Sequence, residues 1–231
     1  MPRVTVFYGL YGSGKSEVAI NYAMALLGRG CGVTVVDLDV VTPYFRVRDA
    51  SESLRKKGIR VLAPADKMQY ADLPVLPETV RRVMKTGEGQ VVVDVGGDPT
   101  GAKVLGGLRD AVPDGSEVFF VVNFRRPFSR TPEEARRSLE LVSQSAGIQP
   151  TGIVANTHLG YLTEVSHVKD GFRLALELGR KTGLPVRMCA VPSWLRESEA
   201  EIFAFTGETP VLWIQRFLLP PWEPPWEDAA W

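Results

Sequence analysis

The amino-acid sequence predicts an α/β fold: a mostly parallel, doubly wound sheet of about seven strands with helices on both faces. Short β-branched segments alternate along the chain with longer amphipathic segments, which is typical of a parallel sheet covered by helices. Continuous apolar runs occur at Val91-Val92-Val93 and at Val118-Phe119-Phe120-Val121-Val122, as expected for strands buried on both faces. A glycine-rich turn between the first strand and the first helix is the third observation.

The individual elements follow from the same alternation. Strands are expected at residues 3–8, 32–37, 59–63, 90–95, 117–123, 151–156 and 186–191. Helices are expected at residues 15–28, 46–57, 78–86, 101–111, 132–146 and 167–182, with a last candidate at 195–205. Residues 1–218 are therefore expected to form one nucleotide-binding domain, for the reasons given below.

Residues 219–231 form a Pro/Trp-rich C-terminal arm in which Pro-Pro-Trp-Glu occurs twice. The prolines prevent regular structure and favour an extended segment. Trp222, Trp226 and Trp231 would be unfavourable in water, so the arm is expected to pack on its own domain or to dock on a second subunit or partner.

The composition limits the classes of function. The 231 residues carry 27 basic and 27 acidic side chains, so no basic excess indicates a nucleic-acid partner. Cys31 and Cys189 are far apart in sequence and are interpreted as small core residues in a reducing compartment. No signal peptide is expected, because the first strand is expected to start by residue 3, and no apolar run approaches the ~18 residues of a membrane span, so a cytoplasmic location is the expectation.

The glycine-rich turn carries the most specific motif. Residues Gly9 to Ser16 read Gly-Leu-Tyr-Gly-Ser-Gly-Lys-Ser and match G-x-x-x-x-G-K-[ST], the P-loop of nucleoside triphosphatases. Backbone N–H groups from Gly9, Gly12, Ser13 and Gly14 and the helix N-terminus would cradle the phosphates. Lys15 would reach the β- and γ-phosphates and the Ser16 hydroxyl would ligate Mg²⁺. The motif predicts a P-loop fold that binds a nucleoside triphosphate.

Two further strand ends offer groups for hydrolysis. Asp94 and Gly97 form a D-x-x-G segment after an apolar strand, where the carboxylate could hold Mg²⁺ and the Gly97 N–H could meet the γ-phosphate. Asp37 and Asp39 lie on the same side of the second strand and could order the waters of Mg²⁺ and the attacking water. For Asp37, capping of the following loop and a role in binding Mg²⁺ are equal alternatives. Asp39 is the stronger candidate for water positioning.

Other polar residues near these strand ends have competing interpretations. Asn156 and Pro192 follow later strands and are placed to contact the base, although Asn156 could instead cap a helix. Asn123 fits a loop cap, and Arg46 and Arg48 fit a solvated helix start better than a phosphate contact. The isolated His158 and His167 are not expected to ligate a metal.

The order of the motifs resembles the MinD/ParA/nitrogenase-iron-protein group of P-loop ATPases, with the CobQ/CobB-type synthetases as relatives. The resemblance covers about residues 3 to 205. It implies that Asp37 and Asp39 form the first switch, Asp94 and Gly97 the second, and that Asn156 and Pro192 contact adenine. It also implies Mg-ATP as the cofactor and a homodimer with nucleotide between the subunits.

The chain departs from this group at Leu10, where MinD and ParA carry a lysine that reaches the partner's phosphates. This difference puts the nucleotide sandwich in doubt. The basic membrane tail of MinD is missing, and Cys31 and Cys189 do not match the cluster ligands of the nitrogenase iron protein.

The favoured function is a Mg-ATP-dependent ATPase switch that acts on a protein partner. The first alternative is an ATP-dependent synthetase or kinase for a small carboxylate, with Tyr44, Phe45, Arg46 and Tyr70 shaping its site. The second alternative is a GTPase. Guanine is usually read by the aspartate of N-K-x-D, whereas Asn156 is followed here by Thr157, His158 and Leu159.

Overall fold

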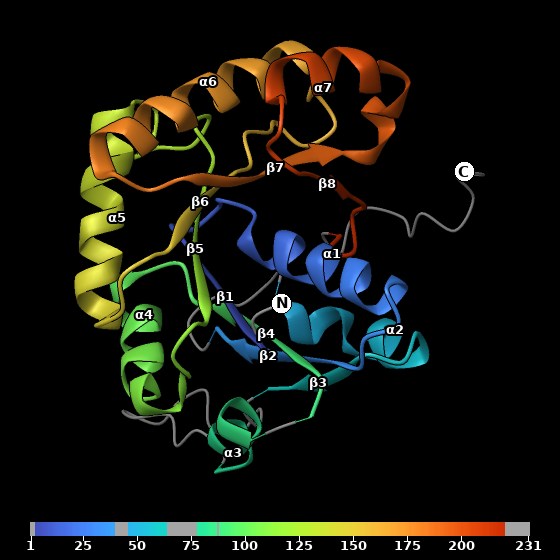
Figure 1. The fold of residues 1–231 in the computed structure, drawn as a ribbon, viewed down its shortest axis with the longest axis vertical. Helices are drawn as coiled ribbons and strands as arrows, with labels where there is room; N and C mark the ends of the chain where they lie inside the picture. Colours follow the sequence, from blue (N-terminus) through green and yellow to red (C-terminus); the bar gives the residue numbers. More distant parts are fainter. Residues whose placement is uncertain (1–2, 40–45, 64–77, 87, 220–231) are drawn as a thin grey trace.

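All neighbouring strands of the sheet run parallel. In chain order they are β1 (Val4–Tyr8), β2 (Val33–Leu38), β3 (Arg60–Leu62), β4 (Gln90–Val95), β5 (Glu117–Val122), β6 (Gly152–Ala155), β7 (Val186–Pro192) and β8 (Val211–Ile214). The spatial order is β3-β2-β4-β1-β5-β6-β7-β8, so β1 lies between β4 and β5 (Figure 1). The computed structural model describes residues 3–39, 46–63, 78–86 and 88–219.

Helices cover both faces of this sheet (Figure 1). One face carries α1 (Lys15–Gly28), the 3₁₀ helix η1 (Val47–Ala50) and α2 (Ser51–Lys56). The other carries α3 (Glu78–Thr86), α4 (Pro99–Gly106), α5 (Pro132–Ala146), α6 (Val165–Thr182) and α7 (Glu199–Thr206). The 3₁₀ helices η3 (Arg109–Ala111) and η4 (Ser193–Ser198) follow α4 and β7. The doubly wound α/β architecture predicted from the sequence is confirmed.

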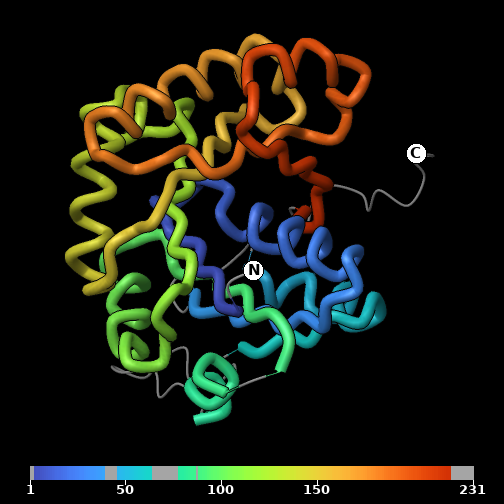
Figure 2. Tube along the Cα trace, in the orientation of Figure 1, coloured from blue at the N-terminus to red at the C-terminus, as the bar shows by residue number. Residues whose placement is uncertain are grey.

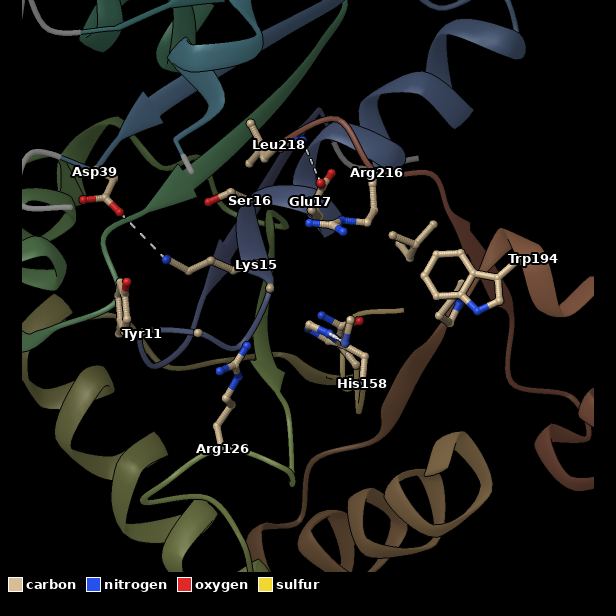
Figure 3. Close-up of a pocket in the computed structure, with 16 residues that line it drawn as sticks. Tyr11, Lys15, Ser16, Glu17, Asp39, Arg126, His158, Trp194, Arg216 and Leu218 are labelled. Atoms are coloured by element: carbon tan, nitrogen blue, oxygen red, sulfur yellow. Dashed lines mark hydrogen bonds and ion pairs between the residues drawn. The ribbon is translucent and has the colours of Figure 1, made fainter. Parts of the chain in front are cut away.

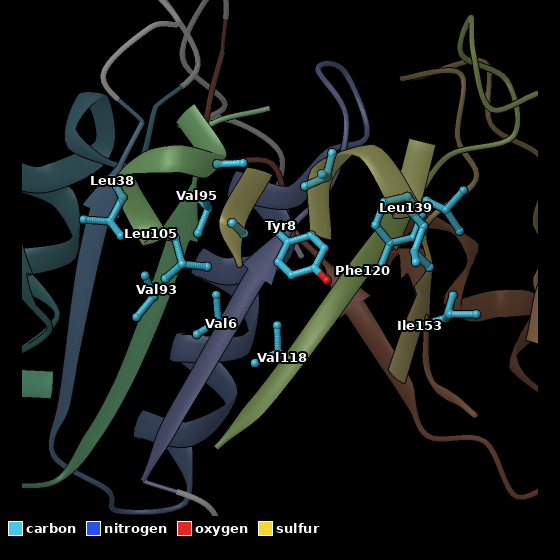
Figure 4. Packing of buried hydrophobic residues seen from close by; sticks show 14 of the residues in the cluster. Val6, Tyr8, Leu38, Val93, Val95, Leu105, Val118, Phe120, Leu139 and Ile153 are labelled. Atoms are coloured by element: carbon cyan, nitrogen blue, oxygen red, sulfur yellow. The ribbon is translucent and has the colours of Figure 1, made fainter. Parts of the chain in front are cut away.

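The central strands bury alternate residues in two hydrophobic cores. Val4, Val6 and Tyr8 of β1 point into the core beneath α3 to α7, whereas Phe7 points into the core beneath α1. The same alternation runs through β4 and β5, and Figure 4 shows the first core with Val93, Val95, Val118 and Phe120 beside Val6 and Tyr8. Strands apolar on both faces read as continuous hydrophobic runs in the sequence, which is why they were recognisable.

Helix α5 illustrates how local sequence sets the ends of an element. The Thr131 hydroxyl accepts a hydrogen bond from the Glu134 N–H at 3.2 Å, and Pro132 occupies the first helical position, where no N–H is needed. Gly147 ends the helix with φ of 64°, a conformation that glycine adopts without strain. These signals place α5 at the residues that the sequence predicted.

The structure corrects the predicted elements in four places, one of which is the helix candidate at 195–205, observed as η4 followed by α7. Strand β8 is an eighth strand, where about seven were expected, because a four-residue edge strand gives little periodicity. The helix expected at 101–111 is α4 from Pro99 to Gly106 followed by η3. The helix expected at 46–57 divides into η1 and α2.

The domain boundary predicted at residue 218 remains a prediction, because residues 220–231, with Trp222, Trp226 and Trp231, lie outside the described residues. Among the helices that are described, none is long and apolar enough to cross a membrane. Cys189 is buried and Cys31 half-buried, both as free thiols.

The carboxyl ends of the strands meet along one edge of the sheet, and the last described segment returns to that edge beside α1 (Figure 2). Ligands of open α/β sheets bind outside the carboxyl ends of the strands. The fold therefore brings the predicted motif residues, which are far apart in sequence, to one place.

Candidate nucleotide-binding site

The P-loop connects β1 directly to α1, as the motif requires. Gly14 has φ of 80°, and a Cβ on it would lie 2.4 Å from the Asn156 Nδ2 atom, so only glycine fits there. The Asn156 amide donates a hydrogen bond of 2.7 Å to the Ser13 carbonyl. The P-loop is thus held in place by the residue that directly follows β6.

Lys15 lies at the N-terminus of α1 and is 5% exposed. Its Nζ atom is 3.9 Å from the Asp39 Oδ2 atom, and Asp39 is 1% exposed (Figure 3). A buried ammonium at the N-terminus of a helix, next to the backbone N–H groups of a glycine-rich loop, makes a site that attracts anions.

Asp94 lies at the end of β4, level with Phe7 of β1 and Asp37 of β2, and is fully buried. Its carboxylate oxygens make no hydrogen bond of ordinary geometry with the described residues, although the Ser16 hydroxyl and the Lys15 ammonium act on the carboxylate. Burial raises the pKa of Asp94 to about 7, while the Lys15 ammonium and the Ser16 hydroxyl act in the opposite direction. A buried carboxylate with so little compensation fits a position facing Mg²⁺ or its waters.

The structure gives Asp37 a set of fixed partners. Arg48 donates to the two carboxylate oxygens at 2.8 and 3.1 Å, and the backbone N–H groups of Arg48 and Asp39 donate at 3.0 and 2.9 Å. These contacts match the first of the two alternatives for Asp37, in which its side chain caps the following loop. Arg46 pairs with Asp49 at 3.3 Å at the start of η1, but the side chains of Arg46 and Arg48 are only 14% and 9% exposed, so the solvated helix start expected for these two residues is wrong.

Gly97 lies against the P-loop. Its carbonyl accepts a hydrogen bond of 2.7 Å from the Tyr11 N–H, and a Cβ on Gly97 would lie 2.7 Å from the Tyr11 nitrogen. The next residue, Asp98, caps α4 by accepting a hydrogen bond of 2.6 Å from the Gly101 N–H. The segment after β4 therefore touches the P-loop directly.

A pocket of about 390 Å³ extends from the P-loop toward the ends of β6, β7 and β8 (Figure 3). Its lining includes the predicted residues Gly12, Gly14, Lys15, Ser16, Asp39, Asn156 and Pro192. The other predicted residues, Gly9, Ser13, Asp37, Asp94 and Gly97, are not part of this lining. Among the described residues no cluster of three or more His, Cys, Asp or Glu is arranged to hold a metal ion.

The sequence reasoning missed several residues that line the pocket: Tyr11, Glu17, Arg126, His158, Gly160, Trp194, Ile214, Arg216 and Leu218. At the far end, the Arg216 guanidinium lies 4.3 Å from the centre of the Tyr161 ring, and that ring is 5.9 Å from the ring of Trp194. Flat groups of this kind can stack on a base. No short motif marks them in the sequence, because they come from three separate loops.

His158 is held as a neutral imidazole. Its Nδ1 atom accepts a hydrogen bond of 3.3 Å from the Gly160 N–H, which assigns the proton to Nε2. Burial, followed by the charges of Arg126 and Arg216, lowers the pKa of His158 to about 4. The Nε2 atom would lie 3.0 Å from a Cβ on Gly14, so His158 presents a donor beside the P-loop.

The segment after β8 is attached to α1 by polar side chains. The Glu17 carboxylate accepts hydrogen bonds from the N–H groups of Phe217 and Leu218, the shortest being 2.9 and 2.8 Å. Asn21 exchanges two hydrogen bonds of 2.8 Å with the backbone of Gln215. The pocket wall formed by Ile214, Arg216 and Leu218 is therefore fixed to the helix that starts at the P-loop.

The similarity to solved structures agrees with this architecture. The 54 kDa signal recognition particle protein of Aeropyrum pernix K1, solved in complex with GDP, superposes with a TM-score of 0.55 at 19% identity, over 81% of this chain and 41% of that one. FtsY of Thermotoga maritima superposes with a TM-score of 0.54 at 17% identity, over 83% of this chain and 62% of that one. FtsY of Elizabethkingia anophelis in complex with GDP superposes with a TM-score of 0.54 at 16% identity, over 83% of this chain and 57% of that one.

These similarities show a P-loop NTPase-like α/β fold, and this chain spans about two fifths to three fifths of the length of those proteins. They do not single out the MinD/ParA group. No protein-family model matches the sequence. No curated protein matches it either.

Proposed function

We propose that this protein is a P-loop ATPase that binds Mg-ATP and acts as a nucleotide-dependent switch on a protein partner. The observation that carries the proposal is the arrangement at the P-loop: Lys15 is buried beside Asp39, and the fully buried Asp94 carboxylate makes no hydrogen bond of ordinary geometry with the described residues. A triphosphate with its divalent cation supplies the charges that this arrangement lacks.

Each residue has a defined role in this proposal. The P-loop N–H groups and Lys15 bind the β- and γ-phosphates, and Ser16 holds the metal with Asp94 and Asp39 contacting its waters. Bound Mg²⁺ supplies charge neutralisation on the phosphates. Asp39 positions the attacking water. Asp37 is a positioning residue, because it accepts the Asp39 N–H and is itself fixed by Arg48.

Adenine is the base in this proposal. Guanine is usually read by a carboxylate at the base end, and among the described residues of the lining the carboxylates are Asp39 and Glu17. Asp39 faces Lys15, and Glu17 accepts the N–H groups of Phe217 and Leu218. Asn156, whose Nδ2 atom binds Ser13, retains its Oδ1 atom to accept from the adenine amino group, with Pro192 beside it.

GTP is the second candidate, and a specific observation favours it: two of the similar structures are complexes with GDP. The Asn156 contact with the P-loop is compatible with either base. Competition between ATP and GTP for the same site decides between them.

The switch function rests on the segments after Asp39 and Gly97. Gly97 contacts the P-loop backbone at Tyr11, so occupation of the γ-phosphate position would act on the segment that leads into α4. Residues 40–45 lie outside the described residues. Tyr44, Phe45 and Tyr70, which the synthetase alternative requires, lie there or in 64–77, and a metabolite that stimulates ATP consumption would support that alternative.

A homodimer remains part of the proposal, although Leu10 replaces the lysine that reaches across dimers of the MinD/ParA type. Light scattering in Mg-ADP and in Mg-ATP measures the mass directly. A rise in mass with ATP supports a dimerising switch, and a constant dimer supports a permanent assembly. A monomer under both conditions contradicts the dimer.

Isothermal titration of ATP, ADP and GTP with Mg²⁺, together with phosphate release, tests the function. Wild type is expected to bind ATP and hydrolyse it, and Lys15→Ala is expected to lose both. Lys103→Ala is the matched control, because Lys103 is exposed on α4. Unchanged binding and turnover in Lys15→Ala would overturn the proposal.

A further inference from the structure

The loop after β5 places an arginine directly over the P-loop. A Cβ on Gly12 would lie 3.3 Å from the Nε atom and 3.6 Å from the Cζ atom of Arg126. Arg126 lines the pocket, and Figure 3 shows its guanidinium directed toward the loop that Lys15 follows. A second cation therefore reaches the phosphate cradle from a different element.

Buried groups hold this loop in position. Asn123 is 1% exposed, and its side chain binds the backbone of His158 at 3.1 Å and that of Arg125 at 3.0 Å. The Ser129 hydroxyl donates to the Asn123 carbonyl at 2.8 Å, and the Arg126 N–H donates to the same carbonyl at 3.1 Å. The backbone of Arg126 is thus fixed before any ligand binds.

The guanidinium itself is available. Within the described residues no carboxylate forms an ion pair with Arg126, whereas its neighbour Arg125 pairs with Asp170 at 3.4 Å. The charge of Arg126 acts on the pocket, since it contributes to the lowered pKa of His158. An arginine without a counter-ion at a phosphate cradle is suited to a planar, two-pronged contact with phosphate oxygens.

We propose that Arg126 contacts the terminal phosphates of the bound nucleotide from within the same chain and stabilises the negative charge that develops during hydrolysis. The inference rests on the proposed function. In that reaction the water oxygen bonds to the γ-phosphorus and the bond to the β–γ bridging oxygen breaks. The electron pair passes to the β-phosphate and the water proton ends on the released phosphate. Arg126 opposes the charge that gathers on these oxygens.

The test compares Arg126→Ala, Arg126→Lys and the control Arg125→Ala, whose side chain pairs with α6. Single-turnover hydrolysis and titrations of ATP and ADP with Mg²⁺ are measured for each. Arg126→Ala is expected to slow hydrolysis at least about tenfold. Arginines in this role accelerate hydrolysis by factors of roughly 10³–10⁵. It should weaken ATP binding several-fold more than ADP binding. Arg126→Lys is expected to recover part of the rate, and Arg125→Ala should match wild type.

The two readouts separate this inference from the proposed function. If wild type binds and hydrolyses nucleotide, Lys15→Ala does not, and Arg126→Ala matches wild type, the inference fails and the function stands. If wild type binds nucleotide without hydrolysing it, an unchanged ratio of ADP to ATP affinities in Arg126→Ala overturns the inference. If wild type binds no nucleotide, both fail. Thermal unfolding of Arg126→Ala, whose side chain is exposed, checks that the variant is folded.

Discussion

At the scale of single residues, the site depends on close contacts between its loops. Gly14 combines a φ of 80° with a position between Asn156 and His158, whose nitrogen atoms would lie 2.4 and 3.0 Å from an added Cβ. Gly30 has nearly the same φ, 79°, but nothing lies within 4 Å of the position of its Cβ. Substitutions at these two glycines therefore distinguish the effect of backbone strain from the effect of a steric clash between the new side chain and its neighbours.

Both Gly14→Ala and Gly30→Ala are expected to lose roughly 1–2 kcal/mol of unfolding free energy through backbone strain. Gly14→Ala should lose more, because Asn156 must move, and it alone should weaken ATP binding, by tenfold or more. Denaturant unfolding and nucleotide titration provide the two measurements. Equal ATP affinity in the two variants would contradict the assigned position of Asn156.

His158 predicts a specific pH dependence of stability. The unfolded chain binds a proton at this histidine below about pH 6.5, whereas the folded chain does so only below about 4. Unfolding free energy should therefore decrease as the pH falls from 6.5 to 4, by up to about 3 kcal/mol from this group.

His158→Gln is expected to reduce that decrease, and His167→Gln, at the chain's other histidine, is expected to retain it. Urea unfolding at several pH values provides the measurement. The same slope in wild type and His158→Gln would show that His158 protonates freely in the folded protein.

At the scale of elements, the sequence predicted the strands that are buried on both faces, because hydrophobic burial dominates their composition. It did not predict β8, which is short and lies at an edge, and it could not reveal the contacts of the loops around the pocket. The P-loop has a fixed local spacing and was recognisable. Arg126, His158 and Arg216 have no such spacing, since their proximity depends on the order of the strands.

Asn21 tests how α1 holds the segment after β8. The side chain is 5% exposed and satisfies both the N–H and the carbonyl of Gln215. Asn21→Ala would leave these backbone groups without partners, with an expected loss of about 2 kcal/mol of unfolding free energy.

The Asn21→Ala variant should also weaken ATP binding, since Ile214, Arg216 and Leu218 form a pocket wall. Ser145→Ala, which removes an exposed hydroxyl that binds its own helix, is the control and should be nearly neutral. Urea unfolding and nucleotide titration measure both effects. A neutral Asn21→Ala would mean that strand pairing, core packing and the Glu17 contacts hold β8 and the segment after it without Asn21.

At the scale of the whole molecule, one sheet joins two hydrophobic cores, and each central strand contributes side chains to both. Neither core can be lost without breaking strands that the other requires. Unfolding is therefore expected to involve the whole sheet, and a ligand at its edge should stabilise the entire fold.

Mg-ATP at 100 times its dissociation constant should add about 2.7 kcal/mol of stability. For a chain of this size the increase in Tm should be about 5–10 °C. Differential scanning calorimetry with and without nucleotide measures it, and Lys15→Ala should show no increase. An equal increase in Lys15→Ala would mean that ATP binds elsewhere.

The attachment of residues 215–218 to Glu17 and Asn21 has a consequence for the synthesis of the protein. The ribosome makes the P-loop near the start of the chain, but the wall that contains Ile214, Arg216 and Leu218 emerges almost two hundred residues later. Domains fold as units as the chain emerges. A nascent chain that stalls before residue 214 would carry an intact P-loop motif and an open pocket, so it should not retain nucleotide.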